Sequence, residues 1–285
     1  MLNKSNLLHL RIPFSFYLMP IFLLALTQIE NWDTYILVTS FLAIHLFLYP
    51  ASQAYNSFYD RDEGSIGGLE NPPKVEESLL TLSLLFDIVA VGLAATISLD
   101  FALCLFLLGL LSKAYSHPAI RLKAKPVLGW LTVAIFQGAG VYISVLVAFD
   151  AFDIILQFET LFLGLVTCLF FGGAYPLTQI YQHEEDEERG DLTISRLLGL
   201  KGTCVFALTV SSLGVLGFFY YFWMLNQLDL FIIFQLFMAP SVSFLVYWIY
   251  KIYGDPSFAN FKQTMRMNQL SAISMILFCL VWIRY

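Results

Sequence analysis

The chain has 285 residues, of which 59% are hydrophobic and only 13% are charged. A soluble globular domain carries about 25% charged residues and about 45–50% apolar ones. This apolar excess is too large for one water-soluble core of this size. The composition therefore excludes an ordinary soluble fold and indicates the lipid bilayer as the solvent. The 15 Lys and Arg form no basic stripe interleaved with aromatic residues, so no nucleic-acid partner is expected.

Nine apolar runs approach the length of about 20 residues that a bilayer-spanning helix requires. In chain order they lie near residues 13–29, 34–54, 78–98, 101–116, 126–148, 159–181, 203–224, 228–251 and 267–284. Only Leu99 and Asp100 separate the third run from the fourth, which predicts a tight helical hairpin. The sequence predicts an all-α, polytopic membrane bundle of about nine transmembrane helices, forming a single domain over residues 1–285.

The positive charges fall almost entirely on one side of this predicted bundle. If the N-terminus is cytoplasmic, 14 of the 15 Lys and Arg lie in inside segments, and only Arg284 lies outside. The outer loops hold acidic residues and no Lys or Arg: Glu30, Asp33, Asp100, Asp150, Asp153, Glu159 and Asp229. Because cytoplasmic loops are enriched in Lys and Arg, we expect an integral, multi-pass protein whose N-terminus and polar inside loops are cytoplasmic.

The first polar segment of interest runs from Asn56 to Gly64, at the inner end of the second span. If the helix continues this far, Asn56 and Asp60 are four residues apart and share one face. An amide and a carboxylate near the membrane surface suit an oxygen-ligated Mg²⁺ that also holds substrate phosphates. The alternative is a helix end that frays into water with ordinary solvated charges.

The second segment, residues 179–193, ends the sixth span. Gln179, Gln182 and Asp186 follow an i, i+3, i+7 spacing, which predicts one shared helical face, and Glu185 adjoins it. Six acids occur in eight residues and would repel one another unless cations were present: Glu184, Glu185, Asp186, Glu187, Glu188 and Asp191. A solvated loop is the alternative, and Glu184, Glu187 and Glu188 fit it best. The two glutamines at a helix end favour partners inside the bundle.

The third segment, residues 113–126, is the inside loop after the fourth span, and it carries several cations. Arg121 and Lys123 are candidates to grip a diphosphate and neutralise it as it leaves. The alternative is that these cations serve only to orient the protein in the membrane, and we favour this for Lys125. Asp87, in the middle of the third span, is costly there and either functional or hydrogen-bonded to a neighbour.

Two acidic helix ends and a basic loop on one membrane face together suit metal-assisted departure of a diphosphate from a substrate with a lipid-soluble tail. In these three segments the sequence resembles the UbiA superfamily of intramembrane prenyltransferases. Asn56 and Asp60 match the first Asp-rich motif of that family. Asp186 matches the second motif, and Gly190 and Thr193 match the residues that follow it. The stretch from Tyr115 to Lys123 is similar to the family's loop between its fourth and fifth helices.

The resemblance implies a central cavity with an aspartate motif on each of two walls. It implies that Mg²⁺ bridges these motifs to an allylic diphosphate, and that an acceptor, often an aromatic ring, captures the carbocation. The expected metal ligands are Asn56, Asp60, Glu185, Asp186 and Asp191. The residues expected to hold the diphosphate or orient the substrate are Arg121, Lys123, Gln179 and Gln182. Tyr115 is expected to donate a hydrogen bond to a phosphate oxygen.

The chain departs from the family pattern at three motif positions. Ser57 replaces the acidic second residue of the first motif, Gly64 replaces its last aspartate, and Gln182 replaces the first aspartate of the second motif. Fewer carboxylates imply weaker metal binding or a shifted set of ligands. Asp62, Glu63 and Glu185 lie close enough in sequence to act as substitutes.

Two other functions are compatible with the sequence. A secondary transporter would place polar residues near the bilayer midplane and break spans in both halves of the chain. Here, apart from Asp87, the charges concentrate at the inner ends of the spans, which favours the enzyme. A non-catalytic membrane protein that keeps the fold with an incomplete metal set is the second alternative. Substitution of Asp60 or Asp186 by Asn distinguishes it, because only an enzyme would lose activity.

Overall fold

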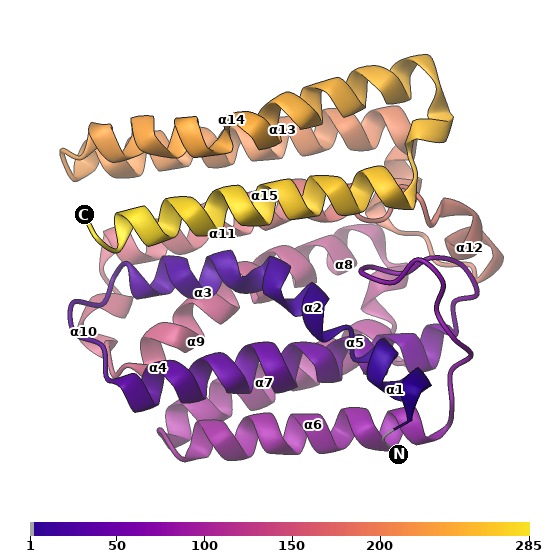
Figure 1. Ribbon diagram of the computed structural model, residues 1–285, viewed down its shortest axis with the longest axis horizontal. Coiled ribbons are helices and arrows are strands. Elements are labelled where there is room, and N and C mark those ends of the chain that lie inside the picture. The colour runs from indigo at the N-terminus through magenta and orange to yellow at the C-terminus, as the bar shows by residue number, and fades with distance from the viewer. Residues whose placement is uncertain (1–2) are drawn as a thin grey trace.

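The computed structural model describes residues 3–285, which form helices joined by turns and loops. Nine helical segments within this range are long and apolar enough to cross a membrane. They are Lys4–Leu26, Thr34–Asp60, Ser78–Ala95, Leu99–Ser116, Pro126–Ala148, Phe158–Leu177, Ile194–Met224, Leu228–Gly254 and Phe261–Trp282. Most of them run along the long axis of the molecule (Figure 1). The predicted all-α membrane bundle is therefore confirmed.

The first two spans are interrupted helices. The first consists of α1 (Lys4–His9), α2 (Ile12–Ser15), the 3₁₀ turn η1 (Phe16–Leu18) and α3 (Met19–Leu26). Arg11 separates α1 from α2 with a φ of 46°, and Pro13 follows in the first turn of α2. The second span consists of α4 (Thr34–Phe41), the π-helical η2 (Leu42–Leu48) and α5 (Tyr49–Asp60). Pro50 has no N–H to donate into the helix, and η2 lies directly before it.

The third and fourth spans form the expected hairpin, α6 (Ser78–Ala95) and α7 (Leu99–Ser116). Ser98 caps α7 by accepting a hydrogen bond from the N–H of Phe101, so the turn between the helices is short. The fifth span follows η3 (Leu122–Ala124) and contains α8 (Pro126–Thr132), the π-helical η4 (Val133–Gly140) and α9 (Val141–Ala148). The short α10 (Phe152–Ile155) then leads into α11 (Phe158–Leu177).

Two helix ends differ from the sequence prediction. The sixth span was expected to reach residue 181, but α11 ends at Leu177 and is followed by a turn and by α12 (His183–Glu188). Pro176 weakens the last turn, and the Tyr175 carbonyl accepts from both Thr178 Oγ1 at 2.7 Å and the Thr178 N–H at 2.9 Å. Thr193 caps α13 (Ile194–Met224), so helical structure begins before residue 203, but Gly199 with a φ of 66° interrupts the helix between its first turn and the expected span. The chain ends with α14 (Leu228–Gly254), η5 (Pro256–Phe258) and α15 (Phe261–Trp282).

The position of α11 is central to the fold because it packs against both η4 and α13. Glycines permit these contacts: a Cβ on Gly173 would lie 2.3 Å from Oγ and 2.9 Å from the backbone N of Ser211 on α13. Large apolar side chains such as Ile88 and Leu236 cover the outside, with 67% and 70% of their surface exposed, as expected for a lipid-facing surface. One end of the bundle carries α1, α12 and the loop that leads into α6, whereas α10 lies at the other end (Figure 1). All three polar segments singled out from the sequence thus belong to one end.

Candidate active site

The end of α5 carries the first polar motif as the sequence predicts. The helix continues through Asp60, and Arg61 ends it with a φ of 51°. Asn56 Nδ2 donates to Asp60 Oδ2 at 2.7 Å and to Ser116 Oγ on α7 at 3.0 Å. The Asp60 side chain is only 4% exposed, so it is not a solvated charge at a frayed helix end.

The second motif has a different local structure from the one expected. Because α11 ends at Leu177, Gln179 and Asp186 do not share one continuous helix, and the predicted common helical face is wrong. A turn joins the two helices instead. The N–H of Gln182 donates to the carbonyl of Gln179 at 3.0 Å, and the N–H of Asp186 donates to the carbonyl of Gln182 at 2.9 Å. Gln179, Gln182 and Asp186 all still line one cavity.

The acids of the second motif divide into buried and exposed groups. Asp186 and Asp191 are 6% and 1% exposed. Glu184, Glu187 and Glu188 are exposed, in agreement with the solvated-loop interpretation. Burial raises the pKa of Asp186 to about 6, although the hydrogen bond from the Arg189 guanidinium opposes this shift.

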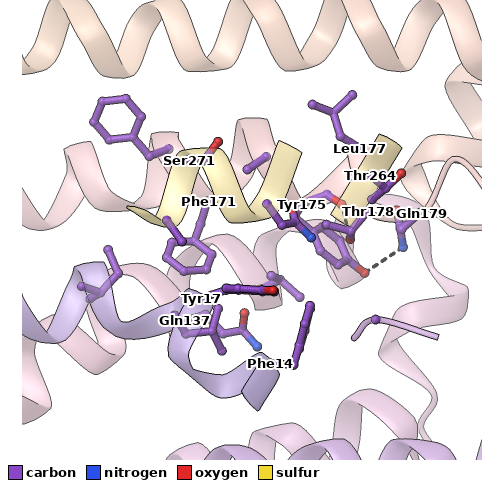
Figure 2. A pocket seen from close by; sticks show the side chains of 18 of the residues that line it. Phe14, Tyr17, Gln137, Phe171, Tyr175, Leu177, Thr178, Gln179, Thr264 and Ser271 are labelled. Carbon is purple, nitrogen blue, oxygen red and sulfur yellow. Dashed lines mark hydrogen bonds between the residues drawn. The ribbon is translucent and has the colours of Figure 1, made fainter. Parts of the chain in front are cut away.

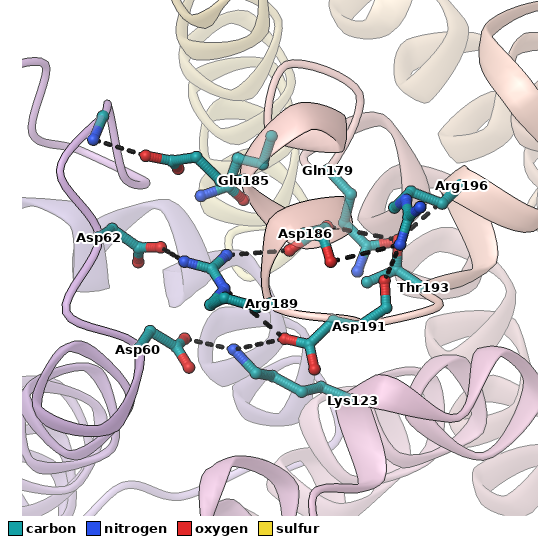
Figure 3. A network of polar contacts seen from close by, with 12 residues as sticks. Asp60, Asp62, Lys123, Gln179, Glu185, Asp186, Arg189, Asp191, Thr193 and Arg196 are labelled. Carbon is teal, nitrogen blue, oxygen red and sulfur yellow. Dashed lines mark hydrogen bonds and ion pairs between the residues drawn. The ribbon is translucent and has the colours of Figure 1, made fainter.

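Glu185, expected as a metal ligand, points toward the loop that follows α5 (Figure 3). Its carboxylate accepts a hydrogen bond from the N–H of Gly64 at 2.6 Å, and it is absent from the cavity lining. A Cβ on Gly64 would lie 2.6 Å from Glu185 Oε1, so glycine allows this close approach. Glu185 connects the two polar loops in the structure.

The basic loop after α7 lies between the two acidic helix ends. Lys123 forms an ion pair with Asp60 and lies 3.7 Å from Asp191 Oδ2 (Figure 3). Arg121 holds Asp191 through both carboxylate oxygens, at 2.6 and 2.7 Å, and these hydrogen bonds raise the pKa of Arg121 above its ordinary value. Lys125 is exposed, as expected for a residue that serves only the charge asymmetry. The loop therefore joins α5 to the second motif.

Arg189 and Asp62 were not singled out from the sequence as a pair. The Arg189 guanidinium forms an ion pair with Asp62 and bonds Asp186 Oδ1 at 3.0 Å, so it joins the two motifs directly (Figure 3). Burial lowers the pKa of Arg189, but Asp62 and Asp60 outweigh this effect and the pKa lies above the ordinary value. The only local signal was the spacing of three residues from Asp186, which suits an ion pair on a helix.

Behind the charged groups lies a cavity of about 500 Å³. Asp60, Lys123 and Asp186 line its polar end. Its remaining lining is mostly apolar and comes from helical segments in both halves of the sequence, including α3, η4, α11, α14 and α15. Figure 2 shows Phe14, Tyr17, Gln137 and Phe171 around this space. The cavity thus combines a charged mouth with an apolar interior.

Tyr115 lines the cavity but bonds another tyrosine. Its hydroxyl forms a hydrogen bond with the hydroxyl of Tyr175, which also accepts a hydrogen bond from Gln179 Nε2 at 2.8 Å (Figure 2). Gln179 Oε1 is buried without a partner. The hydrogen bonds that join Tyr115, Tyr175 and Gln179 therefore leave one acceptor, Gln179 Oε1, without a partner.

A family model described as "UbiA prenyltransferase family" matches residues 14–270. The chain belongs to the UbiA prenyltransferase family. The nine apolar helices found within residues 3–285, together with this family, make it an integral, multi-pass membrane protein. No curated protein matches the sequence.

Solved structures of UbiA homologues share the fold of this chain. A homologue from Archaeoglobus fulgidus bound to DMAPP and Mg²⁺ has a TM-score of 0.72 and 18% identity, covering 99% of each chain. A homologue from Archaeoglobus fulgidus bound to GPP and Mg²⁺ has a TM-score of 0.70 and 17% identity, covering 99% of this chain and 100% of that chain. The apo homologue from Aeropyrum pernix K1 has a TM-score of 0.70 and 16% identity, covering 95% of this chain and 98% of that chain. At these identities the likeness concerns the fold.

The departures from the UbiA motifs have a structural explanation in this chain. Ser57 is buried and does not line the cavity. In this structure, an acidic side chain at position 57 would therefore not face the cavity. Asp62, two residues before Gly64, lines the cavity, so an acid close to the last position of the first motif is kept. Gln182, at the first position of the second motif, also lines the cavity. The cavity therefore keeps carboxylates from both motifs.

The donor chemistry at this site fits a hard divalent cation, because carboxylate and amide oxygens face the cavity from both motifs. As they lie, Lys123 and Arg189 separate these carboxylates. Within residues 3–285, no three His, Cys, Asp or Glu side chains converge on one point. A metal ion at this site therefore requires the basic side chains to move.

Asp87 has a partner inside the bundle. It forms an ion pair with Lys113 of α7, whose ammonium lies 5.1 Å from the centre of the Tyr55 ring on α5. Lys113, expected in the loop, thus belongs to a helix and faces a carboxylate. The pair lies outside the cavity lining, which supports a role in holding α6, α7 and α5 together.

Proposed function

We propose that this chain is a Mg²⁺-dependent intramembrane prenyltransferase that moves a prenyl group from an allylic diphosphate to a small acceptor, often aromatic. One observation carries the proposal: buried carboxylates from α5 and α12 line the same end of a mostly apolar cavity, where Lys123 pairs with Asp60 and Arg189 pairs with Asp186. The polar mouth suits a diphosphate and its counter-ions, whereas the apolar interior suits an isoprenoid tail. The structures from Archaeoglobus fulgidus support this assignment, since they are bound to DMAPP or GPP together with Mg²⁺.

The metal ligands that we propose from the cavity lining are Asn56, Asp60, Asp62 and Asp186. Asp62 replaces Glu185 in the expected set, because Glu185 bonds the Gly64 N–H, and Asp191 supports the site through Arg121 and Lys123. Bound Mg²⁺ supplies Lewis-acid stabilisation of the negative charge that develops on the departing diphosphate.

The other residues bind and orient the substrates. Lys123, which lines the cavity, stabilises the diphosphate as the C–O bond breaks and the diphosphate leaves with the electron pair. Arg121, expected to share this role, lies outside the cavity lining and holds Asp191 instead. The acceptor forms the new C–C or C–heteroatom bond and then loses a proton. Gln179 and Gln182 line the cavity where they can orient substrate, and Tyr115 orients Tyr175 and Gln179 through its hydrogen bond. Aromatic faces such as those of Phe171 and Tyr17 stabilise the carbocation by cation–π attraction.

The charge distribution within the cavity favours this enzyme over a transporter. Among the described residues that line the cavity, the acidic ones are Asp60, Asp62 and Asp186, and all three are at its mouth. A transporter that couples solute to ion movement requires such groups near the bilayer midplane. We also propose that the mouth faces the cytoplasm, because the positive charges favour that side.

The test is incubation of the purified protein with Mg²⁺, geranylgeranyl diphosphate and a panel of acceptors, followed by mass spectrometry of the lipid extract. We expect a prenylated product from the wild type and its loss in Asp60→Asn and Asp186→Asn. Glu184→Gln is the matched control, because Glu184 is an exposed acid of the same helix as Asp186. Equal product from all four proteins, or none from the wild type with any acceptor, would contradict the proposed transferase.

A further inference from the structure

Every buried carboxylate at the cavity mouth has a basic partner in the structure. Asp60 pairs with Lys123, and Asp191 pairs with Arg121. Asp62 and Asp186 share one partner, the Arg189 guanidinium. Four carboxylates that are each 8% exposed or less are thus matched by three cations of this chain. The acidic site is largely neutralised by residues of the protein itself.

Arg189 has a distinct position within this network. Among residues 3–285, it is the only basic side chain within ion-pair distance of Asp62 or Asp186. It also lines the cavity and keeps 20% of its side chain exposed, so the guanidinium faces the space that a diphosphate would enter. A cation that binds both carboxylates and faces the ligand can exchange one anion for the other.

A divalent metal and this guanidinium cannot both hold the same carboxylate oxygens. A metal that enters the free protein must displace Arg189 and leave a cation without its partners in a mostly buried site, which is unfavourable. A diphosphate removes that penalty, because its oxygens offer the guanidinium a bidentate anion of higher charge. Binding of metal and binding of diphosphate are therefore coupled through the position of one side chain.

We propose that Arg189 keeps Asp62 and Asp186 closed to free divalent cations until a diphosphate binds, when its guanidinium moves from the carboxylates to the phosphate oxygens. This inference rests on the proposed function, since it takes the diphosphate as the ligand of the cavity mouth. It assigns Arg189 a positioning role that controls the order in which metal and diphosphate enter.

The experiment measures Mn²⁺ binding to the purified full chain by electron paramagnetic resonance, with and without geranyl S-thiolodiphosphate as an unreactive probe. For the wild type we expect the thiolodiphosphate to tighten Mn²⁺ binding at least tenfold. For Arg189→Gln we expect Mn²⁺ without the probe to bind at least tenfold tighter than to the wild type, and the effect of the probe to fall below threefold. Arg189→Lys keeps one charge without the bidentate fork and should lie between the two.

Arg61→Gln is the matched control, because Arg61 pairs with Glu77 in a solvent-exposed ion pair outside the cavity, and it should match the wild type. Equal or weaker Mn²⁺ binding by folded Arg189→Gln in the absence of the probe would overturn the inference and leave the proposed function intact. If the probe does not tighten Mn²⁺ binding to the wild type, this result alone overturns the inference. Absence of both Mn²⁺ and probe binding from every protein would overturn the proposed function as well.

Discussion

Removal of Arg121 should destabilise the protein far more than removal of an exposed arginine. Asp191 is 1% exposed and receives two charge-assisted hydrogen bonds from Arg121, at 2.6 and 2.7 Å. Each such bond contributes about 1.5–3 kcal/mol, and breaking a buried pair typically costs about 3–5 kcal/mol. Lys123 and Arg189 stay near Asp191 at 3.7 and 3.8 Å and offset part of the loss. We therefore expect Arg121→Met to lower the free energy of unfolding by about 3 kcal/mol.

The assay is unfolding of the purified protein in detergent micelles by titration with a denaturing detergent, followed by tryptophan fluorescence. Arg61→Met is the control, because its ion pair with Glu77 is 55% and 77% exposed and such pairs contribute about 0–1 kcal/mol. Arg121→Lys should recover part of the loss, since it keeps the charge but not the two-pronged contact. Unfolding free energies of Arg121→Met and Arg61→Met that agree within about 0.5 kcal/mol would refute the reasoning.

Three further predictions follow from other contacts. Burial raises the pKa of Asp186 to about 6, so kcat/KM should fall about tenfold per pH unit below that value as the carboxylate takes up a proton. The fall should move to higher pH in Arg189→Gln, whereas a profile flat from pH 7 to 5 would contradict this. Asp87→Leu alone should unfold more easily than Asp87→Leu/Lys113→Met, because the single change leaves an unpaired cation; equal unfolding curves would count against the pair. Gly173→Ala should lower the unfolding free energy by about 1–3 kcal/mol, since its Cβ meets the Ser211 backbone at 2.9 Å, and an unchanged value would exclude that contact.

Hydropathy was sufficient to predict the number of spans, because each span needs only an apolar run of the right length. The ends of the helices were less predictable where polar residues compete for backbone groups. Thr178 Oγ1 bonds the Tyr175 carbonyl and α11 stops at Leu177, although Ile180 and Tyr181 look like a continuation of the span. Conversely, α13 begins at Ile194 in a segment that contains Arg196, which hydropathy places outside the membrane.

The candidate site shows the same division between local and tertiary information. The Asn56–Asp60 spacing was enough to predict a shared face, because both residues belong to one helix. The path of the chain after Leu177 decides which acids of the second motif reach the cavity, so Glu185 could not be separated from Asp186 by spacing alone. Arg189 looked like one basic residue in an acidic loop, and only the fold brings Asp62 to its guanidinium.

The proposed function requires Asp60 and Asp186, from two separate helices, to act on one bound diphosphate. The most direct test is a double-mutant cycle on prenyl transfer with Asp60→Asn, Asp186→Asn and the combined variant, measured as kcat/KM for the allylic diphosphate. Residues that act as one unit give non-additive losses. If the two residues share one site, kcat/KM of the combined variant should be no lower than that of the slower single variant. Losses that multiply, or single variants as active as the wild type, would contradict a shared site.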